Sequence, residues 1–523
     1  MSGDAATFPF RETPLDGPGA LRGRGLPAGG AGELVAGAGA GVRAGALALA
    51  LIVALSAFLV VMAANRPSIL AATTHEGFFP RWMAGPLGGA WPGLPRGTTA
   101  LKYMFTGSVV LMYGGYLVAI AQARRLPAGW LIGAIVAVQA IFLLSPPLAL
   151  TDIFNYINYG RMEVVHHLNP YTTIPILEPH SDPSYALSNW HQLLSPYGPL
   201  FTLLTFAVVP LGVAASFWAL KTILALASLA TILLVWRCAR LLGRDPRTAI
   251  AVAGLNPIVL VWGLGGDHND FLMVFFIVLG FYLLLLARAG GAGVAERPRG
   301  ARGWRSPLPV CAPAMGAGAA LAIAVGIKAS AAVLIPVVLA SLLRDRRMLG
   351  QVLIGMVLAG VASGAASVVA FGLHIPDLST QSELVTSESV PNLIGLALGA
   401  GGESETLRKA MDLALAACVL LCCWRAFSRR WPSEDRSITA AGWASVALLV
   451  TLSWVLPWYV LWALPLAALS SSRRLRAVVL AIGVYMIVVW SPASGLLWNA
   501  IDFHPEKTPL GRLHQRYVKE LLN

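Results

Sequence analysis

Long apolar runs, separated by short polar breaks, recur along almost the whole chain. Each run approaches the roughly 20 helical residues needed to cross a hydrocarbon layer about 30 Å thick. The pattern predicts about thirteen membrane-spanning helices. Their predicted positions are residues 45–63, 101–121, 128–149, 214–236, 248–264, 270–288, 310–327, 328–343, 349–371, 408–427, 438–456, 457–472 and 475–493.

Composition supports this interpretation. The 523 residues are 57% hydrophobic and 12% charged, whereas soluble domains carry about 25% charged residues. We therefore predict an all-α integral membrane protein and exclude a water-soluble multidomain protein. The predicted parts are a disordered, Gly- and Ala-rich cytoplasmic arm (1–44), a transmembrane domain (45–495) whose external loop is 151–213, and an external C-terminal tail (496–523).

Basic residues predict the orientation, because cytoplasmic loops of membrane proteins are enriched in Lys and Arg. Six short loops, near residues 124–125, 237–247, 288–305, 344–347, 425–436 and 473–476, are rich in Arg. They are predicted to be cytoplasmic, so the net charge of +13 reflects orientation and argues little for a nucleic-acid partner. Residues 198–236 are apolar enough for two crossings, but two would place the 237–247 loop outside. We therefore predict a separate interfacial helix, interrupted by Pro210, followed by one span.

With this orientation, the polar clusters that interrupt the apolar pattern all face the exterior. Asp152 follows the third predicted span and could act as a general base. Alternatively, it is a helix-end carboxylate that is hydrated or caps the next helix, which is predicted to start near Ile153. Asn155, Asn158, Arg161 and His167 follow it at spacings that place several of them on neighbouring helical faces. A site of this kind suits a lipid-linked substrate, whose head needs polar groups while its tail stays in hydrocarbon.

Three further clusters belong to this face. The Gly265–Asp270 turn contains Asp267, His268, Asn269 and Asp270, which could bind a divalent ion, a sugar hydroxyl or a phosphate, or could simply be solvated. Lys328 is either a phosphate partner or a helix-end residue that reaches toward water. Trp458 and Tyr459 either contact a substrate or anchor the chain at the membrane interface.

Taken together, these segments resemble the polyprenol-phosphomannose-dependent alpha-1,6-mannosyltransferases of actinobacteria, within the GT-C class of membrane glycosyltransferases. The resemblance runs from about residue 45 to 495. It rests on the segments 151–162, 167–171, 197–200, 256–270, 326–328 and 457–459.

The resemblance implies a GT-C-type helical bundle with external loops and interfacial helices. It further implies that mannose passes, with inversion and outside the membrane, from polyprenyl-phosphate-mannose to a glycolipid or mannan acceptor. Asp152 matches the acidic residue expected to act as the base. Many GT-C enzymes have paired acidic residues here, whereas Ile153 and Phe154 follow Asp152 in this chain. This departure weakens the case for a metal, so no metal ligands are assigned and a divalent cation stays open.

The remaining roles follow from this mechanism. Arg161, His268 and Lys328 are candidates to bind the donor phosphate. The candidates for sugar or acceptor binding are Asn155, Asn158, His167, Asp267, Asn269, Asp270, Trp458 and Tyr459. Alternatives are a lipid-linked-sugar transporter or flippase, a GT-C enzyme that uses another polyprenyl-phosphate sugar, and a non-catalytic scaffold.

Overall fold

The computed structural model describes residues 29–66, 79–148, 152–295, 311–428 and 435–522. These residues form helices and connecting segments, with no β-strand in the described ranges. The all-α fold class predicted from the sequence is therefore confirmed. Residues 1–28 of the predicted cytoplasmic arm lie outside the described residues.

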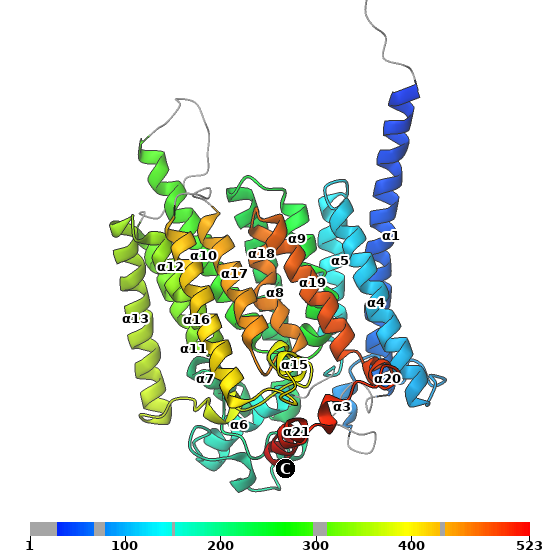
Figure 1. Ribbon diagram of the computed structural model, residues 1–523, viewed down its shortest axis with the longest axis vertical. Coiled ribbons are helices and arrows are strands. Elements are labelled where there is room, and N and C mark those ends of the chain that lie inside the picture. Colours follow the sequence, from blue (N-terminus) through cyan, green and yellow to red (C-terminus); the bar gives the residue numbers. More distant parts are fainter. Residues whose placement is uncertain (1–28, 67–78, 149–151, 296–310, 429–434, 523) are drawn as a thin grey trace, which may run out of the picture.

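The helices form one bundle (Figure 1). In the first half of the chain they are α1 (Gly29–Asn65), α3 (Arg81–Ala84), α4 (Thr98–Gln122), α5 (Ala128–Leu143), α6 (Asp152–His166), η2 (Pro175–Leu177), η3 (Tyr185–Leu187), α7 (Pro199–Val208), η4 (Val209–Leu211), α8 (Val213–Leu241), α9 (Pro246–Gly254) and η5 (Val259–Leu264). In the second half they are α10 (Asp270–Ala295), α11 (Cys311–Ile327), η6 (Ala329–Val333), α12 (Leu334–Leu342), α13 (Arg346–Phe371), α14 (Ser379–Ser382), α15 (Val390–Ala397), α16 (Glu405–Phe427), α17 (Arg436–Thr451), η7 (Pro457–Trp462), α18 (Leu464–Leu469), α19 (Arg473–Trp490), α20 (Ser494–Ala500), η8 (Pro505–Lys507) and α21 (Pro509–Leu522).

Six of the described helices are long and apolar enough to cross a membrane, or seven if the bent pair α19–α20 forms one span. They lie in α1, α4, α8, α10, α13 and α16. The count of thirteen spans is not confirmed, because several predicted spans are short helices or broken segments. In the predicted span 248–264, for example, α9 ends at Gly254 and a π-helical turn follows from Val259. Pro257 lacks the backbone N–H that a continuous helix needs.

The predicted break near Pro210 is present. α7 ends at Val208, Pro210 lies in a 3-10 turn, and Gly212 has φ +81°. Glycine adopts this left-handed conformation without steric cost. One uninterrupted helix, α8, then extends from Val213 to Leu241.

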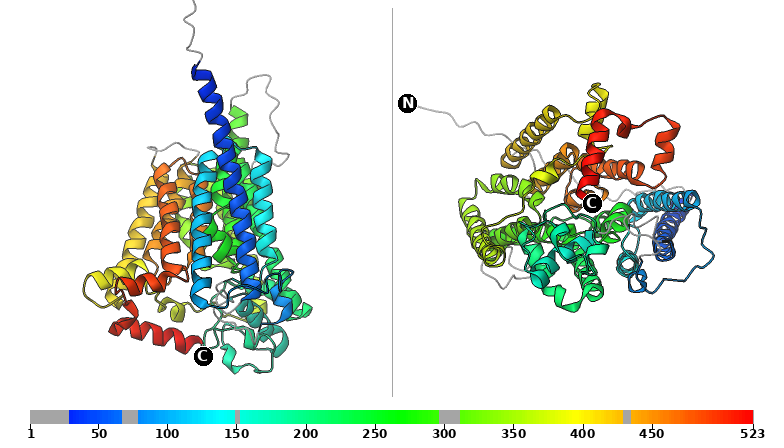
Figure 2. Two further views of the ribbon diagram at one scale, coloured as in Figure 1. Left: turned by 90° about the vertical axis from the view of Figure 1, so that its right-hand side faces the viewer. Right: turned by 90° about the horizontal axis from the view of Figure 1, so that it is seen from below.

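The two ends of the bundle differ. At the basic end, at the top of Figure 1, Arg244 pairs with Asp435 at 2.9 Å and the backbone N–H of Ser471 bonds to Asp435 at 2.8 Å. The opposite end, called the loop end here, carries α6, residues 167–197 and α21 (Figure 1). Figure 2 shows α21 lying across it. The backbone N–H of Gln192 donates to the carbonyl of Leu521 at 3.1 Å, so the predicted C-terminal tail is folded onto the 167–197 segment.

Glycines allow close packing between α11 and α13. A methyl group on Gly318 of α11 would lie 1.9 Å from the Val352 carbonyl of α13, and one on Gly355 would lie 1.9 Å from the Met315 carbonyl. The backbones of α11 and α13 therefore touch directly. The α1 helix begins at Gly29, ahead of the predicted start at residue 45, so this part of the predicted arm is helical.

Candidate functional site

The site is centred on Asp152, the first residue of α6. A carboxylate at this position is stabilised by the partial positive charge of a helix N-terminus. Its Oδ2 lies 3.4 Å from Nδ1 of His268. The imidazole side chain is 1% exposed and the carboxylate 14%, so Asp152 remains open to a substrate on one side. Two candidates from distant parts of the sequence therefore meet.

His268 is held between an indole ring and a glycine. Its ring stacks on that of Trp458, with centroids 3.4 Å apart and an interplanar angle of 8°. A methyl group on Gly266 would lie 2.6 Å from Nε2 of His268, which explains the need for glycine there. Within the described residues, neither this Nε2 nor Nε1 of Trp458 has a hydrogen-bond partner. Because buried polar atoms are usually paired, these two nitrogens have unmet hydrogen-bonding capacity.

Lys328 stands at the break between α11 and η6. Its ammonium bonds to both carboxylate oxygens of Asp270 at 2.9 Å, and Nε1 of Trp462 donates to Asp270 at 2.5 Å. The ammonium also lies 4.9 Å from the ring centroid of Tyr459, within range of a cation–π interaction. The Lys328 side chain is 18% exposed and that of Asp270 is 1%, so the cation is the accessible member of the pair.

The turn between η5 and α10 is fixed by Lys221, a residue that sequence reasoning did not assign to the site. Nζ of Lys221 bonds to Oδ1 of Asp267 at 2.7 Å, and both side chains are almost fully buried. Asp267 adopts a left-handed conformation with φ +60°. A lone lysine within the apolar α8 is the signal that could have identified this residue, since ionisable groups within membrane helices are costly and usually functional.

Asn269 joins the same turn to α6. Its backbone N–H donates to the hydroxyl of Tyr156 at 3.4 Å, and Tyr156 lies one helical turn beyond Asp152. The side-chain amide of Asn269 is fully buried and has no hydrogen-bond partner among the described residues. Its nitrogen and oxygen are therefore further groups that a sugar hydroxyl could satisfy.

Two other candidates on α6 bind the 167–197 segment. Oδ1 of Asn155 accepts the backbone N–H groups of Asn189 at 3.0 Å and Trp190 at 3.3 Å. Asn158 accepts a hydrogen bond from Ser184 at 2.7 Å. These asparagines support the loop that lies next to Asp152.

Asn158 also lies beside a buried acidic group. Burial raises the pKa of Glu178 to about 7, although the amide of Asn158 opposes this shift. A large fraction of the Glu178 side chains is therefore protonated and uncharged near pH 7.

Arg161 and His167 are not brought to Asp152. Arg161 lies nine residues farther along α6, about 13 Å along the helix axis, and donates to Asp182 at 2.9 and 2.8 Å. Burial opposes ionisation of Asp182, but the hydrogen bonds from Arg161 hold its pKa well below the usual range. His167 is exposed just beyond α6 with φ +55°. The assignment of Arg161 to the donor phosphate and of His167 to a sugar stays a prediction.

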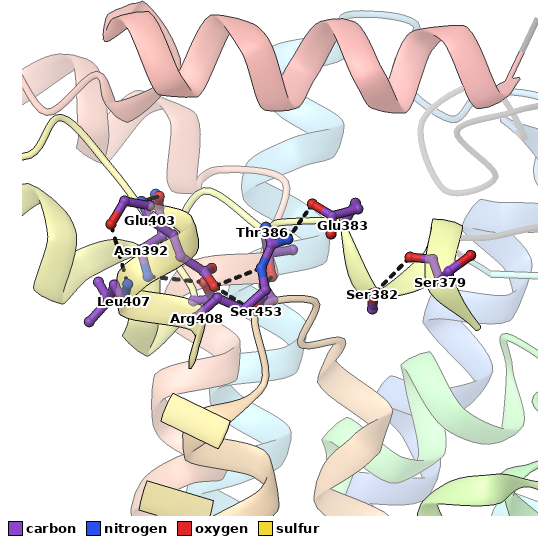
Figure 3. A network of polar contacts seen from close by, with 11 residues as sticks. Ser379, Ser382, Glu383, Thr386, Asn392, Glu403, Leu407, Arg408 and Ser453 are labelled. Atoms are coloured by element: carbon purple, nitrogen blue, oxygen red, sulfur yellow. Dashed lines mark hydrogen bonds and ion pairs between the residues drawn. The ribbon is translucent and has the colours of Figure 1, made fainter. Parts of the chain in front are cut away.

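A separate polar network fixes the chain that carries Trp458. Figure 3 shows Thr386, Glu403, Arg408 and Ser453 within this network. Thr386 donates to the Ser453 carbonyl at 2.9 Å and accepts the Val455 N–H at 3.0 Å. The buried Glu403 accepts bonds from Ser453 at 2.6 Å and Arg408 at 3.3 Å. Sequence reasoning missed these contacts because they join segments that only the fold brings together.

The carboxylate and imidazole side chains of the site are not arranged as a cluster of metal ligands. In the ranges that the structure covers, no group of three or more His, Cys, Asp or Glu residues is arranged to bind an ion. Asp267 and Asp270 instead face Lys221 and Lys328. Whether a divalent cation binds together with the substrate stays open.

Comparisons with known proteins agree with the resemblance found in the sequence. Residues 42–344 match the family described as Alpha-(1->6)-mannopyranosyltransferase, N-terminal domain. The chain belongs to this family. Residues 386–502 match the MptB C-terminal domain. The family's N-terminal match contains Asp152, His268 and Lys328, and the C-terminal match contains Trp458, so both regions contribute to the site.

Curated relatives carry the same designation. A protein of Mycobacterium tuberculosis named Alpha-(1->6)-mannopyranosyltransferase A is 27% identical over 387 residues, which cover 68% of each chain. Its namesake in Corynebacterium glutamicum is 25% identical, over 61% of this chain and 66% of its own. A probable alpha-(1->6)-mannopyranosyltransferase of Mycolicibacterium smegmatis is 25% identical over 76% of each chain. No solved structure matches the chain significantly.

Proposed function

We propose that this protein is an inverting alpha-1,6-mannosyltransferase that uses polyprenyl-phosphate-mannose on the extracytoplasmic face of the membrane. Family membership supports the reaction class. The observation that carries the mechanism is the contact of the partly exposed Asp152 with His268, beside the accessible cation of Lys328. A base and a phosphate partner are the two groups that this reaction needs.

In the proposed step, an acceptor mannose hydroxyl attacks the anomeric carbon of the donor sugar. Asp152 accepts the hydroxyl proton as the new C–O bond forms, and the bond from the anomeric carbon to the phosphate oxygen breaks with its electron pair. The products are an elongated glycan and a polyprenyl phosphate. A single displacement inverts the anomeric carbon, so an α-linked product requires a β-linked donor.

Lys328 would stabilise the charge that grows on the departing phosphate. Its ammonium is held by Asp270 and by the face of Tyr459, so little reorganisation is needed as the charge develops. A doubly protonated His268 would pair with Asp152 through Nδ1 and donate from Nε2, and the amide of Asn269 could bind a sugar hydroxyl. Asp267 and Asp270 each bind a lysine already, so their contribution would be to hold the turn and the cation.

An extracytoplasmic site suits a lipid-linked donor. The basic loops are expected on the cytoplasmic side, which leaves the loop end facing outward. The polyprenyl chain would remain between the apolar helices while the mannosyl phosphate reaches Asp152. A mannosylated phosphatidylinositol, a related glycolipid or a mannan is the acceptor class that we propose.

The test uses purified protein with radiolabelled polyprenyl-phosphate-mannose and an alkyl α-1,6-mannobioside. We expect wild-type protein to transfer mannose, and Asp152→Asn to lower turnover at least about 10²- to 10⁴-fold, since a general base contributes this much. The matched control is Asp502→Asn, the same change at a side chain that is 97% exposed. Near-normal transfer by Asp152→Asn would reject the base, and movement of unmodified lipid across vesicles without transfer would favour a transporter.

A further inference from the structure

Two partly exposed tryptophans face each other at the loop end. Trp190 lies in the 167–197 segment, and Trp454 lies between α17 and η7. Their ring centroids are 6.3 Å apart with an interplanar angle of 84°. In this edge-to-face arrangement, each ring keeps at least one face that its partner does not cover.

Trp190 is positioned from α6. Its backbone N–H donates to Oδ1 of Asn155 at 3.3 Å, and Nδ2 of Asn155 donates to Asn189 at 2.8 Å. Asn155 follows Asp152 by three residues, so the two side chains are neighbours on one helical face. Trp190 is therefore one side chain removed from the proposed base.

Trp454 is tied to the same centre along a different route. It precedes Trp458 by four residues, and Trp458 stacks on His268, which contacts Asp152. The residues on either side of Trp454 are fixed by the network of Figure 3. Ser453 bonds to Glu403, and the backbone of Val455 bonds to Thr386.

We propose that Trp190 and Trp454 form an acceptor subsite that binds a mannopyranose ring of the glycan next to Asp152. The proposal rests on the transferase function argued above. The apolar C–H face of a pyranose fits the electron-rich face of an indole, and the attacking hydroxyl must reach the base. The pair adjoins Asp152 through Asn155, whereas the accessible cation Lys328 lies on the Asp270 side of the turn. This arrangement assigns the tryptophans to the acceptor and Lys328 to the donor phosphate.

A purely structural role explains these rings less well. The segments that carry them are already fastened by buried hydrogen bonds from Asn155, Thr386 and Glu403. Trp190 and Trp454 are both partly exposed, whereas only 2% of the surface of Trp458 is exposed. Aromatic area that is open to solvent beside a catalytic carboxylate is available for a ligand.

The experiment measures steady-state kinetics of Trp190→Ala and Trp454→Ala with an alkyl α-1,6-mannotetraoside as acceptor. Each variant should raise the acceptor KM about threefold to tenfold, with little change in kcat or in the donor KM. Trp190→Tyr and Trp454→Phe should restore most of the affinity, because an aromatic face is retained. The matched control is Trp498→Ala, which removes a partly exposed indole paired with Phe503 at 5.4 Å, away from Asp152.

Direct binding separates this proposal from the proposed reaction. Each full-length protein is titrated calorimetrically with the mannotetraoside in the absence of donor. Trp190→Ala and Trp454→Ala should bind the oligosaccharide more weakly than wild type, whereas Trp498→Ala should bind it as wild type does. If wild type binds the oligosaccharide in a Trp190-dependent manner but transfers no mannose, the subsite survives and the reaction is rejected. An unchanged acceptor KM in both alanine variants, or a rise confined to the donor KM, overturns the subsite.

A second readout applies if an alanine variant does not fold. A diazirine-bearing mannotetraoside should crosslink to the segments around residues 190 and 454 in wild-type protein, as mapped by peptide mass spectrometry. Crosslinks confined to other segments overturn the proposal.

Discussion

At the scale of single residues, the site depends on a charge pair that is removed from water. Lys221 and Asp267 are 1% and 2% exposed and are 2.7 Å apart. Removing one member of such a pair leaves an unpaired buried charge, which costs about 3–5 kcal/mol, whereas replacing both members costs far less. The pair also fixes Asp267 in its left-handed conformation, directly before His268.

This difference predicts a non-additive result. Lys221→Met should lower the midpoint of thermal unfolding strongly, and the double variant Lys221→Met/Asp267→Asn should recover a large part of the loss. Asparagine is a suitable replacement because it tolerates positive φ. Fluorescence-detected unfolding in detergent measures both effects. A wild-type midpoint for Lys221→Met, or additive losses in the double variant, would contradict this account.

The same scale shows what a linear sequence can reveal about the site. Asp152 and the Gly265–Asp270 turn could be found because each is a dense polar cluster beside an apolar run. The structure brings the two into contact through His268 and Asp152. The partners Lys221 and Trp190 could not be found in this way, because a lone lysine and a loop tryptophan acquire their meaning only from neighbours far away in sequence.

At the scale of elements, short polar segments hold the loop end together. Residues 383–408 meet the connection between α17 and η7 through Thr386, Glu403 and Ser453 (Figure 3). Glu403 is fully buried and accepts two hydrogen bonds. Unsatisfied buried groups cost about 1–3 kcal/mol each, so the connection should open when this network is weakened.

Glu403→Gln is expected to raise amide hydrogen exchange across residues 452–456 about 5- to 150-fold, the equivalent of about 1–3 kcal/mol of local stability. Exchange in α8 should stay unchanged. Glu405→Gln is the matched control, since Glu405 pairs with Lys409 at the surface, where both side chains are more than 70% exposed. Equal exchange in the two variants would show that the network does not hold the connection.

Helix breaks also set the limit of prediction at this scale. The separation of α7 from α8 was predicted from Pro210 and from the position of basic residues. The number of spans was not, because hydropathy measures apolar length and is insensitive to a π-helical turn at Val259 or a 3-10 segment at Pro457. Those irregular segments are also the ones that carry the site, since they turn Trp458 and the 265–270 turn toward α6.

At the scale of the whole molecule, the two chemically different ends predict an orientation in the membrane. Single cysteines are placed in a background whose five natural cysteines are replaced by alanine. In intact cells, Ser181→Cys at the loop end should react with a membrane-impermeant maleimide, and Arg474→Cys at the basic end should react only after permeabilisation. Both positions are exposed, so accessibility of the thiol itself is matched. The reverse pattern would contradict the extracytoplasmic site.

The contact between Gly198 and Gly326 limits how this architecture can vary. A methyl group on Gly198 would lie 2.2 Å from the carbonyl oxygen of Gly326, and the Gly198 N–H bonds to Ile327 at 3.1 Å. The backbone at Gly198 therefore packs directly on the backbone of residues 326–327, which precede Lys328. No side chain lies between the two segments. Related proteins should accordingly retain glycine at the position of Gly198, because any Cβ there would push apart the two segments that position Lys328.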